Sequence, residues 1–233
     1  MNNIDPVEVL YEDNHLIVVN KQPGELVQGD KTGDYTLADK VKKYLKIRYN
    51  KQGNVFLGIP HRLDRPARGI VIYAKTSKAL SRMAEMFKHG NITKTYLAIV
   101  ENKPFEKEAM LINYLKKNEK QNKSYVYDEQ VVGAKESKLI YKYVTSSKNY
   151  HLLEVQLLTG RHHQIRAQLA NIDCPIKGDL KYGAKRSNPD GGIDLLAYKV
   201  EFVHPVKKID MQIIAPLPKN NLWQYFADYL IQN

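Results

Sequence analysis

The sequence predicts an α+β protein built on a mixed, largely antiparallel β-sheet with flanking helices. Three observations favour this fold class: strand-like segments outnumber helical ones, only three or four helices lie between them, and residues 103–148 alternate apolar with charged residues. Such alternation is typical of antiparallel hairpins with one face in water. A doubly wound parallel sheet would instead need a helix after nearly every strand.

The first ninety residues carry the signals of three strands and two helices. Thr36, with Asp39 three residues later, forms a loose capping box that should begin a helix. Gly90 is placed to end a second helix, whose apolar residues form one stripe. The strands are expected where apolar residues run in short stretches. These elements are the strands 7–12, 15–20 and 69–75, the helix that Thr36 begins, and the helix 77–89.

The rest of the chain is expected to consist mainly of strands, with one short and one C-terminal helix. Residues 103–148 hold ten Lys against six acidic residues, so they are a candidate basic sub-lobe lying across a substrate, within one domain spanning 1–233. The remaining elements are the strands 94–101, 150–158, 195–203 and 208–216, a short helix after Gly160, a loop over 185–194 and a helix over 220–231.

Charge points to a polyanionic partner. The 233 residues include 36 Lys and Arg against 25 Asp and Glu, a formal net charge of +11. An excess of this size in a protein of ordinary composition favours nucleic acid, although a merely basic protein is the alternative. There is no run of 18 apolar residues and no secretory signal, and Cys174 is the single cysteine. We therefore expect a cytoplasmic protein with no disulfide and no membrane partner.

Common cofactor and metal signatures are missing. The sequence has no GxxxxGK[ST], no GxGxxG after a strand, no CxxC and no GxSxG. His162 and His163 are adjacent, and adjacent histidines rarely bind one metal ion. We expect neither a cofactor nor a metal site.

Two dense polar clusters remain as candidate sites. The segment HRLDRPARG (61–69) places His61, Arg62 and Asp64 directly before a buried strand, where a loop is held firmly. Cations flank Asp64, which should keep it ionised and able to act as a nucleophile. A surface turn of ion pairs would explain the charges, but not their concentration beside an apolar strand.

The second cluster is TGRHHQIRAQLA (159–170). It crowds Arg161, His163 and Arg166 around the first turn of the expected helix. Cations at this end of a helix oppose the helix dipole, so an anionic partner is implied. That partner is either a phosphate or Asp64.

These clusters resemble the motifs of the RluA-type pseudouridine synthases. HRLDRPARG is similar to the family's HRLDxxTSG, TGRHHQIRAQLA to TGRxHQIRxHL, and KTYLAIV (94–100) to the strand that carries the active-site tyrosine. The opening segment 9–28, PIKGDLKYG (175–183) and FVHP (202–205) also fit, so the resemblance covers nearly the whole chain. It begins within the first ten residues, so we expect a catalytic domain that lacks the N-terminal S4-like RNA-binding domain of many relatives.

The resemblance implies isomerisation of specific uridines in ribosomal or transfer RNA to pseudouridine, after the target base has flipped out. It makes Asp64 the catalytic carboxylate, Arg166 the arginine that pairs with it, and Tyr96 the tyrosine that stacks under the base. Arg62 then fills the gap left by the flipped uridine or holds its phosphate. His61, Arg161 and His163 contact the RNA backbone or support the site.

The sequence departs from the family pattern at positions outside this set. Ala67-Arg68 replaces the usual Thr-Ser, Lys21-Gln22-Pro23 the usual Lys-Pro, and Gln168 a common histidine. Leu196 also stands where the family often has His-Ala. These changes bear on which RNA is bound rather than on the chemistry.

Two other functions compete with this interpretation. A non-catalytic RNA-binding module would share the basic surface, but it has no use for an aspartate among arginines. A hydrolytic nucleosidase would need a second carboxylate or a water-activating group, and the motifs contain none. No coiled coil is apparent, so we expect a monomer.

Overall fold

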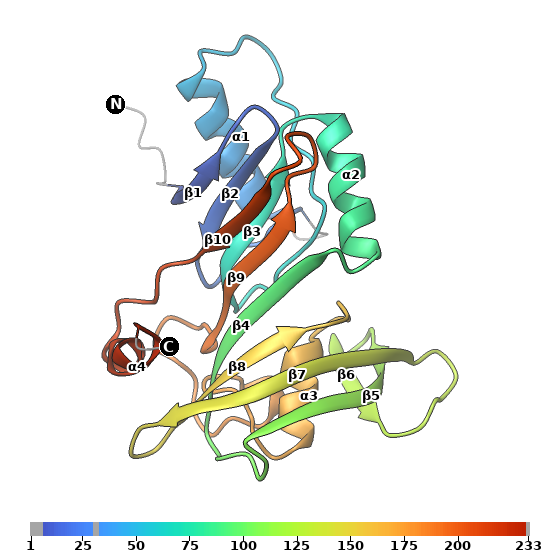
Figure 1. Ribbon diagram of the computed structural model, residues 1–233, viewed down its shortest axis with the longest axis vertical. Coiled ribbons are helices and arrows are strands. Elements are labelled where there is room, and N and C mark those ends of the chain that lie inside the picture. Colours follow the sequence, from blue (N-terminus) through green and yellow to red (C-terminus); the bar gives the residue numbers. More distant parts are fainter. Residues whose placement is uncertain (1–6, 30–32, 232–233) are drawn as a thin grey trace. The chain divides into compact units, whose positions relative to one another are not determined.

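The computed structural model describes residues 7–29 and 33–231, which form two compact units (Figure 1). The first contains the described residues up to Ile92 together with Lys199–Ala215, and the second contains Thr93–Tyr198 and the described residues from Pro216 on. The described residues hold ten strands, four α-helices and one short 3₁₀ helix, and the strand pairs are mostly antiparallel. The predicted fold class is confirmed.

The first unit is a sheet with two helices. Its strands follow the order β1-β2-β3-β9-β10, with β2 antiparallel to both β1 and β3, and β10 antiparallel to β9. Of β9, the part from Lys199 belongs to this unit. The elements are β1 (Val9–Glu12), β2 (Leu16–Lys21), α1 (Leu37–Arg48), β3 (Arg68–Ala74), α2 (Ser77–Lys88), β9 (Leu195–Val203) and β10 (Asp210–Ile214).

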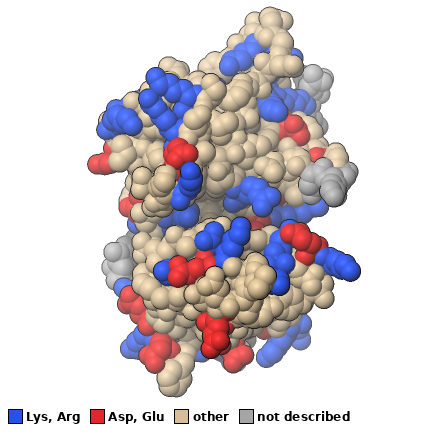
Figure 2. Space-filling model, turned by 90° about the vertical axis from the view of Figure 1, so that its right-hand side faces the viewer, with Lys and Arg blue, Asp and Glu red and all other residues tan. Residues whose placement is uncertain are grey.

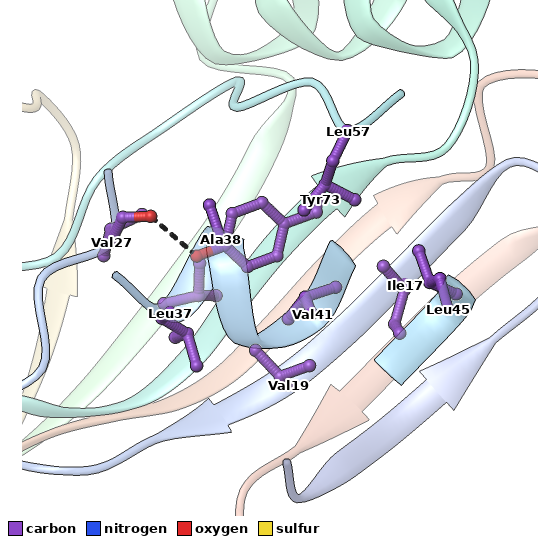
Figure 3. Packing of buried hydrophobic residues seen from close by; sticks show 10 residues of the cluster. Ile17, Val19, Val27, Leu37, Ala38, Val41, Leu45, Leu57 and Tyr73 are labelled. Carbon is purple, nitrogen blue, oxygen red and sulfur yellow. Dashed lines mark hydrogen bonds between the residues drawn. The ribbon is translucent and has the colours of Figure 1, made fainter. Parts of the chain in front are cut away.

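The core of this unit lies between α1 and strands β2 and β3 (Figure 3). The buried side chains of α1 recur at the helical spacing, and β2 and β3 supply the apolar residues opposite. Within the core, the Tyr73 hydroxyl donates to the carbonyl of Val27 at 2.9 Å, which satisfies its polar atom. The cluster comprises Ile17, Val19, Val27, Leu37, Ala38, Val41, Leu45, Leu57, Val71 and Tyr73.

Both predicted helix boundaries in the first unit are confirmed. The Thr36 hydroxyl accepts the Asp39 N–H at 3.2 Å, and the Asp39 carboxylate accepts the Thr36 N–H at 3.1 Å, which completes the capping box. Helix α2 ends at Lys88 with His89 as its C-cap, and Gly90 follows with a φ of +74°. A left-handed residue here suits glycine, which has no side chain to clash.

The second unit is built on an antiparallel sheet. Its strands follow the order β4-β8-β7-β5-β6, so residues 103–148 form the predicted hairpins. Along β5, exposed and less exposed residues alternate, as expected for a sheet with one wet face. The elements are β4 (Ile92–Val100), β5 (Glu108–Asn118), β6 (Lys123–Tyr127), β7 (Lys135–Ser146), β8 (His151–Leu157), α3 (Gln164–Asn171), the 3₁₀ helix Leu180–Tyr182 and α4 (Asn221–Ile231).

Helix α3 covers one face of the β5–β6 hairpin. Ala167 of the helix packs with Leu115 of β5 and with Tyr182, and Val126 of β6 lies at the edge of this cluster. Helix α4 is held by Trp223, whose Nε1 donates to the buried carboxylate of Asp194 at 2.9 Å. No helix in the described part of the chain is both long and apolar enough to cross a membrane.

Candidate active site

Asp64 lies in a tight turn in front of β3. The Ala67 N–H donates to the Asp64 carbonyl at 3.1 Å, which closes the turn through the backbone. The preceding residue, Leu63, packs against the core of the first unit, while Asp64 itself is half-buried. The turn therefore presents the carboxylate from a segment anchored on both sides.

The Lys21 side chain holds this turn through hydrogen bonds to its backbone carbonyls. The Lys21 side chain is fully buried, and its Nζ donates to the carbonyls of Ala67 at 2.7 Å, Arg65 at 2.9 Å and Gln22 at 3.1 Å. Burial lowers the pKa of Lys21 to about 8. Three carbonyl acceptors match the three N–H donors of an ammonium group, so Lys21 joins the end of β2 to the Asp64 turn.

A second contact strengthens this connection. The Gly24 N–H donates to the Arg65 carbonyl at 2.9 Å, and Arg65 Nε donates back to the Gly24 carbonyl at 3.0 Å. Gly24 has a φ of +86°, a conformation that glycine adopts without strain. The segment after β2 thus lies against the turn in a defined register.

His61 and Arg62 differ in their surroundings. His61 Nε2 accepts the Ile72 N–H at 2.9 Å, so the neutral ring carries its proton on Nδ1. The His61 ring also stacks on Phe87 of α2, with 4.5 Å between ring centroids. Arg62 is exposed. These environments suit support of the loop by His61 and contact with a ligand by Arg62.

In the second unit, Tyr96 lies on β4 opposite Val155 of β8. Its neighbours Thr95 and Leu97 are buried, whereas Tyr96 is half-buried and lies on the other face of the strand. Lys94 is two residues away and shares that face, and burial lowers its pKa. An aromatic ring and a cation are thus presented side by side from a regular strand.

Helix α3 begins at Gln164, so Arg161 and His163 precede its first turn instead of lying within it. The reason is His163, whose φ of +52° is left-handed and cannot continue a helix. Gln164 Oε1 accepts the Arg161 N–H at 3.0 Å and the Thr159 hydroxyl at 2.8 Å, which fixes this turn. Arg161 is exposed, and its Nε donates to the Glu136 carbonyl at 2.8 Å.

His163 is buried and neutral. Its Nδ1 lies 3.0 Å from the Tyr182 hydroxyl, and its ring stacks on His162 with 3.8 Å between centroids. Burial, with the positive charge of Arg166 nearby, lowers the pKa of His163 to about 2. At neutral pH His163 therefore supports the turn and carries no charge toward an RNA phosphate.

The burial of neutral His163 predicts that the free energy of unfolding falls at acid pH. An unfolded His163 binds a proton below about pH 6.5, whereas the folded state does not, so stability should be lost as the pH falls below that value. The loss between pH 7 and pH 4.5 should reach about 2.5 kcal/mol. In urea unfolding at pH 7 and 4.5, His163→Gln should lose less stability than the wild type. The exposed His89→Gln should match the wild type, and an acid loss in His163→Gln equal to the wild type would contradict this account.

Arg166 is buried in an ion pair with Asp179. Arg166 Nε lies 2.6 Å from Asp179 Oδ2 and Nη2 lies 2.9 Å from Oδ1, and the two side chains are 4% and 2% exposed. The sequence predicts that the anion at this helix start is a phosphate or Asp64. The structure shows Asp179 as an anionic partner of Arg166 that the sequence analysis does not identify. The signal for it is the short polar segment GDLKYG (178–183), which follows an apolar connection.

The site residues therefore fall into two groups. His61, Arg62 and Asp64 share one loop of the first unit, while Tyr96, Arg161, His163 and Arg166 belong to the second unit. Among the described residues, no group of three or more His, Cys, Asp or Glu is arranged to hold a metal ion.

Comparisons with known proteins match this chain to one family. A profile of the family described as RNA pseudouridylate synthase matches residues 15–171. The chain is 30% identical over 232 residues to ribosomal large subunit pseudouridine synthase D of Xylella fastidiosa, covering 92% of this chain and 67% of that one. It is 32% identical over 213 residues to an uncharacterized RNA pseudouridine synthase of Mycoplasma genitalium, covering 91% and 67%.

A solved structure shows the same fold. Human RNA pseudouridylate synthase domain containing 4 aligns with a TM-score of 0.77 and 21% identity over 96% of this chain and 93% of that one. Fold and sequence together define an enzyme that modifies RNA. The chain belongs to the RNA pseudouridylate synthase family, and it is an RNA pseudouridine synthase, an isomerase.

Proposed function

We propose that Asp64 is the catalytic carboxylate of this synthase and that its substrate is large-subunit ribosomal RNA. The observation that carries the first part is the turn itself. It holds one carboxylate half-buried among arginines and is fixed by Lys21, which suits a group that must be charged and precisely placed. The second part rests on relatives named as synthases of the ribosomal large subunit, about 30% identical to this chain.

The reaction rearranges one nucleotide without an external reactant. The bond between ribose C1′ and uracil N1 breaks, the uracil turns, and a bond forms between C1′ and uracil C5. The hydrogen leaves C5 as a proton, and N1 gains one. Asp64 is available to attack the sugar or the base, or to act as a base at the ribose, and each role needs an ionised carboxylate beside the uridine.

The other site residues serve the same uridine in this proposal. Tyr96 is the aromatic platform on which the detached uracil turns, since its ring is presented from a rigid strand. Arg166 is the cation that orients the catalytic carboxylate. Arg62 is exposed and able to occupy the space of the flipped base or hold its phosphate. His61, Arg161 and His163 support the two loops.

Surface charge supports RNA as the partner. On the side drawn in Figure 2, Lys and Arg are spread over both units, and on the first they are more frequent than Asp and Glu. On α1, Lys42, Lys43 and Lys46 are exposed, whereas Lys40 pairs with Glu25 at 2.9 Å. We propose the three exposed lysines as phosphate contacts. We further propose that the two units act as one catalytic domain and that the protein is a cytoplasmic monomer.

The turn between β5 and β6 is a second candidate RNA contact. Residues 116–123 hold four lysines and one glutamate, and Lys123 Nζ lies 5.6 Å from the ring centroid of the exposed Tyr125. Lysines beside an exposed aromatic ring are typical of surfaces that bind unpaired RNA. Lys181 Nζ donates to the carbonyls of Gln121 and Asn122 at 3.2 Å, which ties the turn to the rest of the unit.

We expect a double substitution in this turn, Lys117→Gln with Lys120→Gln, to weaken RNA binding. Removing two phosphate contacts should reduce the slope of log K against log salt by about 1.5 to 2. The measurement is a salt titration of RNA affinity. Lys78→Gln with Lys88→Gln, two exposed residues of α2, removes the same charge and is the matched control. Equal slopes for the two double variants would remove this turn from the RNA surface.

The substrate is tested with separated RNA pools from cells that lack this protein. Purified enzyme is added to ribosomal RNA or to transfer RNA, and pseudouridines are mapped at nucleotide resolution. New sites in large-subunit RNA support the proposal. New sites only in transfer RNA would reject the substrate while keeping the enzyme. Release of free uracil would instead indicate a hydrolytic nucleosidase.

A further inference from the structure

The ion pair between Arg166 and Asp179 engages one edge of the guanidinium. Nε and Nη2 donate to the two oxygens of the same carboxylate, which is the fork geometry that sets the plane of an arginine. The remaining N–H groups lie on the other edge of the guanidinium, where they can serve a second acceptor. One arginine can therefore be held by one carboxylate and act on another.

The backbone around Asp179 is itself locked. The Asp179 carbonyl accepts the N–H groups of Tyr182 and Ala184, both at 3.0 Å. Gly178, just before it, has a φ of +89°, and a Cβ there would lie 2.7 Å from Asn188 Nδ2 and 2.8 Å from the Gly192 carbonyl. Only glycine fits at this position. The loop 188–192 thus closes over the residue that places Asp179.

Tyr182 confines the guanidinium on another side. Arg166 Cζ lies 5.0 Å from the centroid of the Tyr182 ring. The Tyr182 hydroxyl accepts the Ser124 N–H of β6 at 2.8 Å and lies 3.0 Å from His163 Nδ1. The ring is therefore fixed by a strand and by the turn before α3.

A buried ion pair is a costly way to stabilise a fold. Removing two charges from water is offset only by good geometry, and an apolar pair of similar volume often stabilises as well or better. Arg166 and Asp179 have that geometry, yet Lys177 and Asp194 of the same unit form an ion pair in which the lysine remains partly exposed. A fully buried guanidinium with a bidentate carboxylate partner is the arrangement expected where the orientation of the arginine matters.

We propose that Asp179 is a positioning residue that sets the orientation of the Arg166 guanidinium for pseudouridine formation. This inference rests on the proposed role of Arg166 in the reaction. Asp179 does not touch the uridine in this account, and it acts only through Arg166.

The test is a double-mutant cycle under single-turnover conditions with a structured RNA substrate. Asp179→Asn should lower the rate of pseudouridine formation by about 30- to 100-fold and change RNA affinity by less than about threefold. Arg166→Met should lower the rate by at least as much. The double variant should be no slower than Arg166→Met alone, because Asp179 has no further effect once the arginine is gone.

Asp194→Asn is the matched control. Asp194 is equally buried, accepts hydrogen bonds from Trp223 and Lys177, and lies in the same unit. Its substitution should lower the melting temperature and leave the rate per folded molecule unchanged. If Asp179→Asn behaves in the same way, or slows Arg166→Met further, Asp179 is only structural and the inference fails.

Two outcomes separate this inference from the proposed function. If Arg166→Met leaves the rate unchanged, the proposed role of Arg166 is wrong and the inference falls with it. If Arg166→Met is slow and Asp179→Asn is not, only the inference is wrong. Should Asp179→Asn fail to fold, Asp179→Glu keeps the charge but moves the carboxylate by one methylene. It should then fold and react slowly, and a wild-type rate in Asp179→Glu would overturn the proposal.

Discussion

Asp64→Asn should reduce pseudouridine formation by at least about 1,000-fold while RNA binding is kept, because it removes a group that takes part in bond making and breaking. The Ala67 N–H donates to the Asp64 carbonyl, a backbone bond that asparagine retains, so the substitution should preserve the backbone of the turn. We therefore expect the melting temperature to stay close to that of the wild type. The measurement is the single-turnover rate together with a binding titration.

Asp34→Asn is a control for the loss of one negative charge near this loop. Asp34 is exposed and pairs with Arg65 at 3.3 Å, and exposed ion pairs contribute little. Its rate should stay within about threefold of the wild type. An Asp64→Asn variant as active as Asp34→Asn would exclude Asp64 from the chemistry, and the RNA-binding interpretation would then gain support.

Lys21→Met should have the largest effect on stability among the residues that hold the loop. Methionine fills a similar volume, but it cannot donate to the carbonyls of Gln22, Arg65 and Ala67. The loss of all three hydrogen bonds, including the one to the buried Ala67 carbonyl, should cost about 2 kcal/mol or more, although the Arg65 carbonyl keeps its bond from the Gly24 N–H. The Asp64 turn should also loosen, so we expect the rate to fall at least about tenfold at a temperature where the variant is folded.

Chemical denaturation and the single-turnover rate measure the two effects of Lys21→Met separately. Lys40→Met is the comparison, since Lys40 lies in α1 and makes a partly exposed ion pair with Glu25, a residue of the segment after β2. Lys40→Met should change stability by less than about 1 kcal/mol. If Lys21→Met is no less stable and no slower than Lys40→Met, the connection between β2 and the turn does not hold the loop.

Local signals made much of the fold predictable. The capping box of Thr36 and Asp39 and the glycine after α2 act within a few residues, so sequence alone places both helices. The alternation over 103–148 likewise reflects which side of each strand faces water. The sequence pattern predicts a start for α3 that is too early, because the left-handed conformation of His163 is set by packing and not by residue type.

The site was predictable in its residues but not in its contacts. Asp64, Tyr96 and Arg166 stand within recognisable motifs, whereas Lys21 and Asp179 act across 46 and 13 residues of sequence. A lysine at the end of a strand and an aspartate in a turn are ordinary surface residues in a sequence. Only the fold shows that they are buried and paired.

The most direct test of the central claim uses RNA transcribed with uridine tritiated at C5. Forming the bond between C1′ and C5 expels this hydrogen, so each pseudouridine made releases one tritium to water, whereas hydrolysis leaves the label in free uracil. Wild-type enzyme acting on large-subunit RNA should release tritium in proportion to the pseudouridine mapped, and Asp64→Asn should release none above background. Tritium release by Asp64→Asn at the wild-type rate, or free labelled uracil with the wild type, would contradict the account.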